Sequence, residues 1–355
     1  MNVWQTVHMN AWRNPGVMAA LGAAVLFGAG APAAKLLLGS MSPWLLAGLL
    51  YLGSGFGLAL ARQFRRTESV RLGRGEVKWL AIAVATGGVV GPVLLMVGLS
   101  RMPASAASLL LNAEAVFTAL LAWFVFHENF DRRIAFGMVL IVIGAFVLSW
   151  PGDVGVVSAL PALAVLGACF SWAIDNNLTR KIALTDATFI AMTKGIVAGV
   201  VNVTIAWTLG ATFPSFQVIA AAGAVGFFSF GASLVLFVVA LRHLGAARTG
   251  AYFSIAPFAG AMIAFVLLGE SVTVTLVLAG LLMAAGVWLH LTERHEHDHA
   301  HDATEHTHEH AHDKHHQHEH EIPVPHNTRH THRHRHDPLK HSHSHYPDAH
   351  HGHRH

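Results

Sequence analysis

Histidine dominates the C-terminal part of this chain, where residues 292–355 hold 24 of its 28 histidines. They alternate with other residues in runs such as HEHDHAH, HRHRH and HSHSH, with Asp and Glu interleaved. Imidazole is the commonest protein ligand for late transition metals, and it binds them as the neutral form that dominates above about pH 6.5. The composition therefore predicts a tail that binds divalent Ni, Zn, Co or Cu. The predicted ligands are His295, His297, His299, His301, His306, His308, His310, His312, His316, His318, His320, His332, His334, His336, His341, His343 and His345.

The tail has few apolar residues, so it cannot bury a core, and we expect it to be disordered without metal. If helix continues into it as far as Pro323, i,i+4 pairs such as His295 and His299 suit two-point chelation. Stretches beginning at His295 and His308 match the H-E-x-x-H pattern of zinc proteases. In a tract so dense in His and Glu the match is expected by chance, and catalysis needs a rigid helix beside an open cleft. A solubilising or pH-responsive segment is the alternative interpretation.

A second set of candidate residues lies inside long apolar stretches. A charge at the centre of a bilayer costs at least about 2.5 kcal/mol, so such residues usually face a pathway through the protein. Glu114, beside Asn112, is predicted to hold a proton or a substrate cation. The alternative is a neutral Glu that is hydrogen-bonded to a neighbouring helix.

Asp175 and Lys194 are predicted to pair across two consecutive helices, because they lie at similar depth when counted from the segment that joins those helices. The pair would leave the amides of Asn176 and Asn177 to bind substrate. A salt bridge that only fixes helix packing is the alternative interpretation. The single cysteine, Cys169, is expected to be a small buried residue of the same stretch.

The elements that position these residues are ten apolar stretches. The chain is 53% hydrophobic and 12% charged, whereas a soluble domain carries about 25% charged residues. Each stretch has about the 20 residues that a membrane-spanning helix needs, and none shows the polar alternation of a barrel strand. The predicted spans are 16–38, 43–61, 77–100, 104–126, 133–150, 156–178, 187–209, 216–241, 246–268 and 272–291. The sequence thus predicts an all-α integral membrane protein with ten transmembrane helices.

An internal duplication divides these spans into two halves. Residues 99–128 align without a gap with residues 241–270, and Leu21-Gly22-Ala23 matches Leu166-Gly167-Ala168. Each half has five spans, an odd number, so the two repeats must be inverted relative to each other. Lys35 and Arg180 then take matching places at opposite faces, where each either snorkels to the interface or gates a mouth of the pathway. The predicted domains are an N-terminus (1–15), two repeats (16–150 and 151–291) and the tail (292–355).

Loop charge predicts the orientation. The basic loop residues that share one side of the membrane are Arg62, Arg65, Arg66, Arg71, Arg74, Lys78, Arg132, Arg133, Arg180, Lys181, Arg242 and Arg248. The loops of the other side carry Arg101 alone, so both termini are predicted to be cytoplasmic. A signal peptide ending near residues 31–33 is the alternative for the first span, but its removal would break the symmetry of the repeats.

Glycine and proline predict interruptions in three spans. The residues concerned are Gly28, Gly30 and Pro32 in the first span, Gly87, Gly88, Gly91 and Pro92 in the third, and Pro257 and Gly260 in the ninth. Broken helices free backbone groups that can line a cavity, so we expect the first and third spans to do so. Close helix packing through small residues is the alternative.

Two segments carry a resemblance to a known family. The stretch EAVFTALLAWFVFHE closes the fourth span, and GESVTVTLVLAGLLMAAGVWL covers the last span and the loop before it. Together with the inverted repeat they resemble the EamA type of the drug/metabolite transporter superfamily, over residues 16–291. The resemblance implies a multi-pass carrier of the bacterial inner membrane that commonly exports small metabolites. Residues 175–181 depart from the usual pattern of the family.

Three hypotheses of function follow. The first is an exporter of a small metabolite that needs no cofactor for transport and whose tail senses or buffers divalent metal. The second is a carrier of Ni, Co or Zn itself, although the spans offer few metal ligands besides Glu114, Asp175 and Cys169. The third is a membrane-anchored metal-binding protein without transport. The expected partners are lipid, a small molecule and metal ions, with a homodimer left open and nucleic acid excluded. The sequence offers no nucleotide-binding loop and no constellation of nucleophilic residues, so an enzyme is not predicted.

Overall fold

A computed structural model of the chain describes residues 15–65, 74–126, 132–149, 159–180, 186–244, 246–291, 296–301, 304–310, 330–336 and 339–344. Side chains are described for these residues except at some helix ends and in the tail. The helical part and the segment Arg294–Pro347 are separate compact units, and each is described by itself.

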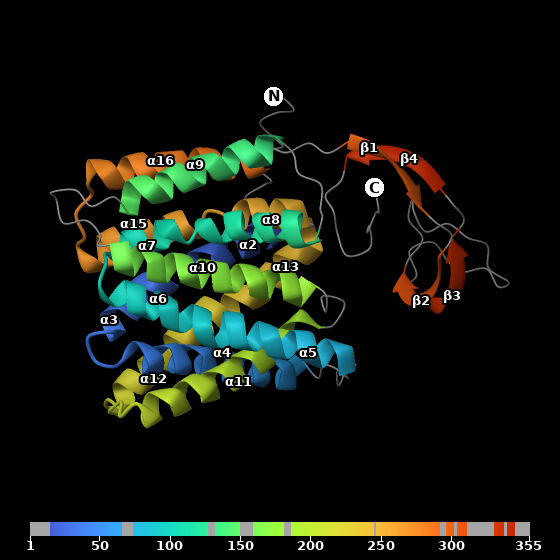
Figure 1. The fold of residues 1–355 in the computed structure, drawn as a ribbon. Helices are drawn as coiled ribbons and strands as arrows, with labels where there is room; N and C mark the ends of the chain where they lie inside the picture. The colour runs from blue at the N-terminus through green and yellow to red at the C-terminus, as the bar shows by residue number, and fades with distance from the viewer. Residues whose placement is uncertain are drawn as a thin grey trace, which may run out of the picture. The chain divides into compact units, whose positions relative to one another are not determined.

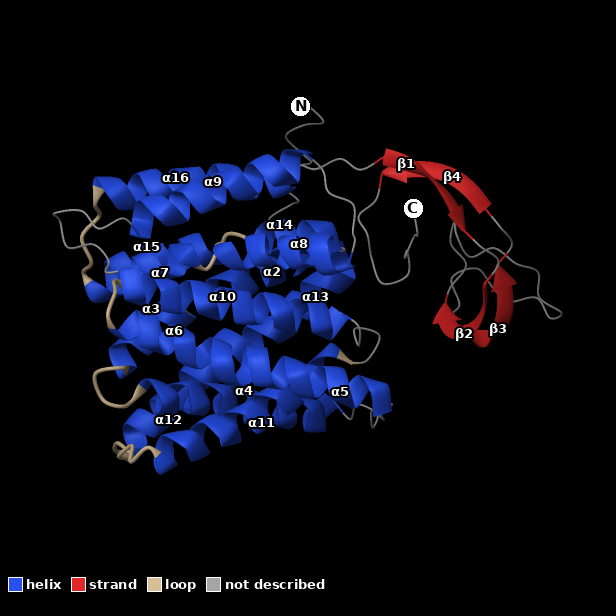
Figure 2. Cartoon of the chain, viewed as in Figure 1, coloured by secondary structure: helices blue, strands red, loops and turns tan. Residues whose placement is uncertain are grey.

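The helical unit follows the predicted order of spans (Figures 1 and 2). The first repeat contains α2 (Pro15–Gly28), α3 (Gly30–Leu37), α4 (Pro43–Arg65), α5 (Arg74–Ala83), η1 (Val84–Val90), α6 (Gly91–Ser100), α7 (Ala104–Leu110), α8 (Ala113–Phe126) and α9 (Arg132–Ser149). The second contains α10 (Ala159–Arg180), α11 (Ala187–Thr208), α12 (Phe216–Gly226), η2 (Phe227–Ala232), α13 (Ser233–Leu244), α14 (Ala246–Phe253), α15 (Ala256–Leu268) and α16 (Val274–Leu291). Each interrupted span consists of two or three of these elements.

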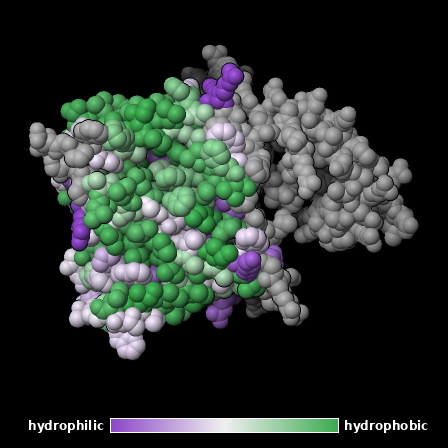
Figure 3. All heavy atoms as spheres, viewed as in Figure 1, coloured by the Kyte–Doolittle hydropathy of each residue, from purple (hydrophilic) through white to green (hydrophobic). Residues whose placement is uncertain are grey.

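The helices have the length and surface of a membrane protein. Within the described residues, nine helical stretches are long and apolar enough to cross a membrane, and a shorter apolar helix covers Val274–Leu289. Large apolar side chains such as Phe64 and Val266 lie exposed, and the face seen in Figure 3 is mostly hydrophobic. Such a surface is stable against lipid tails, not water. The prediction of ten spans is confirmed.

The two repeats are inverted, as the packing of α4 against α11 shows. Gly48 lies against Val203, Leu52 against Gly199, and Gly55 against Ile196. The residue numbers rise along one helix as they fall along the other, so these helices are antiparallel. Each is the second span of its repeat, and the lack of side chains on their glycines lets the backbones approach closely.

The same pseudo-twofold relation holds elsewhere in the bundle. The fifth and tenth spans, α9 and α16, pack together, and Figure 1 shows them side by side. The first span contacts the eighth through α2 and α13, and correspondingly the sixth contacts the third through α10 and α6. The repeats are therefore interleaved, and groups from both halves meet in the interior.

The predicted interruptions are present, and there are two more. The first span turns at Ala29, the third contains the π-helical segment η1, and the ninth breaks at residues 254–255. The fourth span also breaks, at residues 111–112, and the eighth contains the π-helical segment η2. The break in the fourth span is equivalent to the predicted break in the ninth, and the break in the eighth span is equivalent to the predicted break in the third. π-Segments shift the ladder of backbone hydrogen bonds and often occur at functional sites.

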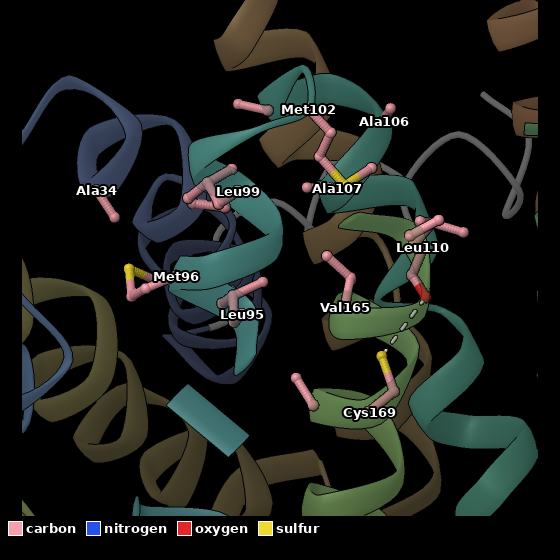
Figure 4. Close-up of a cluster of buried hydrophobic side chains, with 14 of the residues drawn as sticks. Ala34, Leu95, Met96, Leu99, Met102, Ala106, Ala107, Leu110, Val165 and Cys169 are labelled. Carbon is pink, nitrogen blue, oxygen red and sulfur yellow. Dashed lines mark hydrogen bonds between the residues drawn. The ribbon is translucent and has the colours of Figure 1, made fainter. Parts of the chain in front are cut away.

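Two ends of the bundle are distinguished below. The Arg101 end carries the connections 38–42, 101–103, 209–215 and 269–273, and the Asp186 end carries the ends of α4 and α13 and the start of α11. A dense apolar core lies between α3, α6, α7 and α10, with Leu99, Met102 and Leu110 fully or almost fully buried. Figure 4 shows this cluster, including Cys169.

The tail forms the second compact unit. It contains four strands, β1 (Glu296–His301), β2 (Thr304–His310), β3 (His330–His336) and β4 (Leu339–Ser344). They form two antiparallel two-stranded sheets, β1 with β4 and β2 with β3. The i,i+4 histidine pairs of a helical tail are absent from these strands. The physical reason lies in the HxHxH pattern, whose period of two matches a strand.

Candidate functional site

Glu114 lies directly after the break in the fourth span. Residues 111–112 form a turn, and α8 begins at Ala113, so Glu114 is in the first turn of a helix, where a negative charge is favoured. The Nδ2 of Asn176, from the sixth span, donates a 2.8 Å hydrogen bond to Glu114 Oε1. The equivalent position in the second repeat is the buried Ala256. The break is therefore common to both halves, whereas the acid belongs to one.

Asp175 and Lys194 form the predicted ion pair between α10 and α11. The Asp175 side chain is 6% exposed and that of Lys194 is 17% exposed. The Oγ1 of Thr179 donates a further hydrogen bond of 2.9 Å to Asp175 Oδ1. Because Asp175 directly precedes Asn176, the ion pair and the Glu114 hydrogen bond lie at the same level of the bundle.

The π-helical segment of the third span makes room for the ion pair. A Cβ atom added to Gly87 would lie 2.0 Å from Asp175 Oδ2 and 2.5 Å from Asp175 Cβ. The carbonyl oxygen of Gly87 accepts 2.9 Å hydrogen bonds from Tyr51 Oη and from Trp172 Nε1. Asn202 Nδ2 donates to the carbonyl oxygen of Gly88 at 3.2 Å. Side chains of three other helices thus bind the carbonyls of this segment.

Four spans meet at this polar cluster, which we define as Glu114, Asn176, Asp175 and Lys194 with the backbone of Gly87. They are the third, fourth, sixth and seventh spans, and Tyr51 of the second span hydrogen-bonds to Gly87. The charges of Asp175 and Lys194 act on Glu114. A carboxylate among fixed charges in a water-poor interior can bind a cationic group or exchange a proton with a substrate or with water.

Access to the cluster follows from the exposure along α10. Cys169, Ala173 and Asn176 lie on one stripe, since residues three or four apart share a face of a helix. The first two are completely buried, and Asn176 is exposed. Leu163 and Phe170 are exposed on a different face. The stripe is therefore buried toward the Arg101 end, and its exposed residue, Asn176, lies nearer the Asp186 end.

The other predicted pathway residues have different environments. Asn177 Nδ2 donates to the carbonyl oxygens of Thr118 and Ala173, and Asn112 Nδ2 donates to that of Leu109. These amide groups hold backbone at helix breaks and between helices. Lys35 Nζ donates to backbone carbonyls in the corner between the third and fourth spans. Arg180 is the last residue of α10, and its side chain lies outside the described residues.

Several residues around the cluster were missed by the sequence reasoning. Tyr51 and Trp172 read as ordinary aromatic residues of apolar spans, and Gly87 read as a helix break with no partner. At the other end of the bundle, Glu270, which binds the start of α7, was also missed, although its recurrence at the position of Glu128 was a usable signal. Among the side chains that the structure describes, no three His, Cys, Asp or Glu residues lie together as metal ligands do. The predicted histidine ligands have side chains outside that set.

A bundle of apolar helices built as an inverted repeat, with charged groups buried at mid-depth, defines a multi-pass membrane transporter. The chain belongs to the EamA-like transporter family, whose model matches residues 14–150 and again residues 159–292. The predicted family and fold are thereby confirmed, and the two matches coincide with the two repeats.

Relatives support this assignment. The chain is 30% identical to an "Uncharacterized transporter" of Methanothermobacter thermautotrophicus over 77% of its own length and 85% of the relative's. It is 42% identical to a "Probable amino-acid metabolite efflux pump" of Salmonella typhimurium, over 23% of this chain and 27% of that protein. It is 33% identical to a "Probable 4-amino-4-deoxy-L-arabinose-phosphoundecaprenol flippase subunit ArnE" of Pseudomonas fluorescens, over 30% of this chain and 91% of that one. One crystal structure matches with a TM-score of 0.58 and 16% identity, covering 78% of this chain and 96% of the other, and it supports the fold alone.

Proposed function

We propose that this protein is a secondary transporter that exports a small metabolite across the bacterial inner membrane and uses Glu114 to bind a cationic group or a proton. The observation that carries the proposal is the hydrogen bond between Glu114 and Asn176 at the level of the Asp175–Lys194 pair. These groups come from spans far apart in the sequence and meet beside Asn176, which is exposed. Charged groups in a membrane interior are costly and are typically retained for transport.

The direction of transport is inferred from the relatives. One is named an amino-acid metabolite efflux pump, a name that describes export of small molecules, and another a flippase subunit for a lipid-linked sugar. The same carboxylate, ammonium and amide groups would suit a substrate with both hydrogen-bond donors and acceptors. The substrate is thus proposed to be a small polar metabolite.

The orientation follows from the positive-inside rule. Lys78, Arg132 and Arg133 lie on helices that begin at the Asp186 end, and Arg101 lies at the other end. We place the Asp186 end, both termini and the tail in the cytoplasm. The polar cluster then lies nearer the cytoplasmic end of the bundle, where a binding site for export must be reachable in one state of its cycle.

The test is complementation of a deletion strain on a panel of toxic metabolite analogues, amino-acid analogues included. Wild-type protein should restore resistance, and Glu114→Gln should not, with efflux of an accumulated analogue slowed at least tenfold. Glu76→Gln is the matched control, because it makes the same change in the first turn of the third span, and it should transport normally. Membrane levels of all three proteins are measured in parallel. Equal efflux by wild type and Glu114→Gln across pH 6 to 8 would refute the role of Glu114.

We further propose that the tail binds divalent Ni, Zn, Co or Cu in the cytoplasm and senses or buffers it. Beyond composition, the strand register supports this: His297 pairs with His343 and His299 with His341 in one sheet, and the other sheet pairs histidines at three positions. Alternate residues of a strand share a face, so each sheet has a face rich in histidine positions. Deletion of the tail should leave the bundle inserted and able to transport.

Transport of the metal itself is the second candidate, and a membrane-anchored metal-binding protein without transport is the third. The tail is the feature that favours both. Against a metal pathway stands Lys194, a cation beside Asp175 in the interior, together with the lack of a three-ligand cluster among the described side chains. A metal panel in the same complementation assay separates the candidates, because a metal carrier would protect against one metal.

A further inference from the structure

At the Arg101 end, the corner between the third and fourth spans contains the end of one helix and the start of the next. α6 ends at Ser100 and α7 begins at Ala104, with residues 101–103 between them. A helix end leaves carbonyl oxygens without partners, and a helix start leaves N–H groups without partners. Four residues of this corner are nonetheless buried, namely Leu99, Met102, Ala104 and Ser105. Their backbone groups therefore need partners from elsewhere.

Two charged side chains from distant parts of the chain supply those partners. Lys35 Nζ, from the first span, donates to the carbonyl oxygens of Leu99 at 2.5 Å and Met102 at 3.0 Å. Glu270 accepts from the backbone N–H of Ala104 at 2.6 Å and of Ser105 at 2.9 Å, and from Ser105 Oγ at 2.5 Å. A cation at a helix C-terminus and an anion at a helix N-terminus are the signs that helix dipoles favour. The two side chains also attract each other electrostatically.

The chain turns sharply to bring Glu270 into this position. Gly269 ends α15 with a φ of +64°, a left-handed conformation that favours glycine. Glu270 follows directly and contacts the start of α7. The second repeat thus holds a helix of the first repeat through one carboxylate, while Lys35 holds the end of the neighbouring helix.

Below this corner the interior is filled by side chains. Leu99, Met102 and Leu110 belong to one buried cluster with Cys169, whose Sγ lies 3.6 Å from the carbonyl oxygen of Leu110 (Figure 4). The interior between the polar cluster and the Arg101 end is closed at this level, whereas Asn176, nearer the other end, is exposed. An exporter must open the Arg101 end to release its substrate, so the corner must separate from the elements that hold it.

The repeat supplies an independent indication. Glu128 stands at the position of Glu270, and Arg180 stands at that of Lys35, so an acid and a base of the same kind recur for the opposite face. Their side chains lie outside the described residues. A pair of interactions whose residue types recur in both inverted halves fits a function that both faces need in turn.

We infer that Lys35 and Glu270 are gating residues that hold the Arg101 end closed by capping α6 and α7, and that they release this corner when the protein opens outward. The inference rests on the proposed function, since a gate presupposes transport. Loss of either side chain leaves buried helix-end groups without partners in the closed state only. The equilibrium between the two states should therefore shift toward the outward-open one.

The native Cys169 is a reporter for the test, because it is the chain's one cysteine and lies buried below the corner. A membrane-impermeant maleimide is added to the outer side of right-side-out vesicles, or to the cytoplasmic side of inverted vesicles, that contain the full-length protein. Lys35→Met and Glu270→Gln should label at least tenfold faster than wild type from outside, equivalent to about 1.4 kcal/mol. From the cytoplasmic side they should label more slowly than wild type.

Three controls sharpen the outcome. Asp186→Asn removes an ion pair at the opposite end and should not speed labelling from outside. Ser105→Ala keeps both backbone hydrogen bonds to Glu270 and should have a much smaller effect. Glu270→Asp is a milder variant in case Glu270→Gln does not fold, as judged by size-exclusion chromatography, and it should show a partial increase.

Faster labelling from both sides would mean general loosening of the bundle and would overturn the inference, as would unchanged labelling in folded variants. Labelling needs no transported substrate, so a failure of the gate and a failure of the export assay can be told apart.

Discussion

The ion pair between Asp175 and Lys194 yields the most quantitative prediction. The perturbations are Asp175→Asn, Lys194→Met and the double variant. Each single change leaves one partner without its counter-charge in a site where the two side chains are 6% and 17% exposed. Solvent screening is weak at such burial, so the discount that applies to surface pairs is not needed. The double change removes both charges together.

Removing one partner of a buried ion pair costs about 3–5 kcal/mol in soluble proteins, chiefly because the other charge stays buried. In a membrane the unfolded reference state keeps some polar partners, which lowers measured couplings. We therefore expect each single variant to lose about 3 kcal/mol of unfolding free energy and the pair to show a coupling of about 2 kcal/mol. The double variant should consequently lose about 4 kcal/mol, which is less than the roughly 6 kcal/mol expected if the two losses were independent.

The assay is reversible unfolding in mixed micelles with increasing SDS, followed by tryptophan fluorescence. The matched control is the same cycle on Arg62 and Asp186, an ion pair whose side chains are 11% and 30% exposed. Its coupling should be about 1 kcal/mol or less, because solvent screens it more. A double variant that loses the full sum of the two single losses, or equal couplings for the two pairs, would refute the argument from burial.

Three further predictions follow from single features. Gly87→Ala should destabilise the bundle by about 2 kcal/mol or more, because its Cβ would overlap the Asp175 side chain. Thermal unfolding in detergent measures this loss. The control is Gly223→Ala, because a Cβ added at Gly223 would have open space around it. Burial alone would raise the pKa of Asp186, but hydrogen bonds from Arg62 and two backbone N–H groups lower it below the ordinary 3.8. Wild type should thus be more stable than Asp186→Asn by the full amount above pH 3.8, and this advantage should vanish below the lowered pKa. The measurement is the difference in Tm between the two proteins from pH 7 to 3. A difference that stays constant over this range would contradict the prediction. A peptide of residues 294–355 should bind several Ni²⁺ ions at pH 7.5 and few at pH 5.5, because protonated imidazole cannot ligate; equal calorimetric binding at both pH values would exclude metal ligation by histidine.

Some long-range features could be predicted because they depend on depth and periodicity. The apolar stretches predict the spans, since a bilayer imposes one length on every helix. The contact between Asp175 and Lys194 was predictable because consecutive antiparallel helices place residues at equal distance from their connection side by side. The breaks in the first, third and ninth spans follow from their glycines and prolines, which weaken or remove backbone hydrogen bonds.

Other features depend on the rotation and tilt of helices, which the sequence does not specify. Asn176 binds Glu114, whereas Asn177 binds backbone. The difference depends on the rotation of about 100° between consecutive residues of α10 and on how that helix faces α8. The π-segments and the fit of Gly87 against Asp175 arise only when the third and sixth spans pack.

The sequence by itself therefore determined the membrane-spanning architecture, its inverted symmetry and the contact between Asp175 and Lys194, because these depend on composition and spacing. Only the tertiary structure decided what those residues touch. Lys35 and Glu270 stand far apart in the chain from the corner that they cap. Their partners are backbone groups freed by two helix ends, and backbone partners leave no mark in the residue types of a sequence.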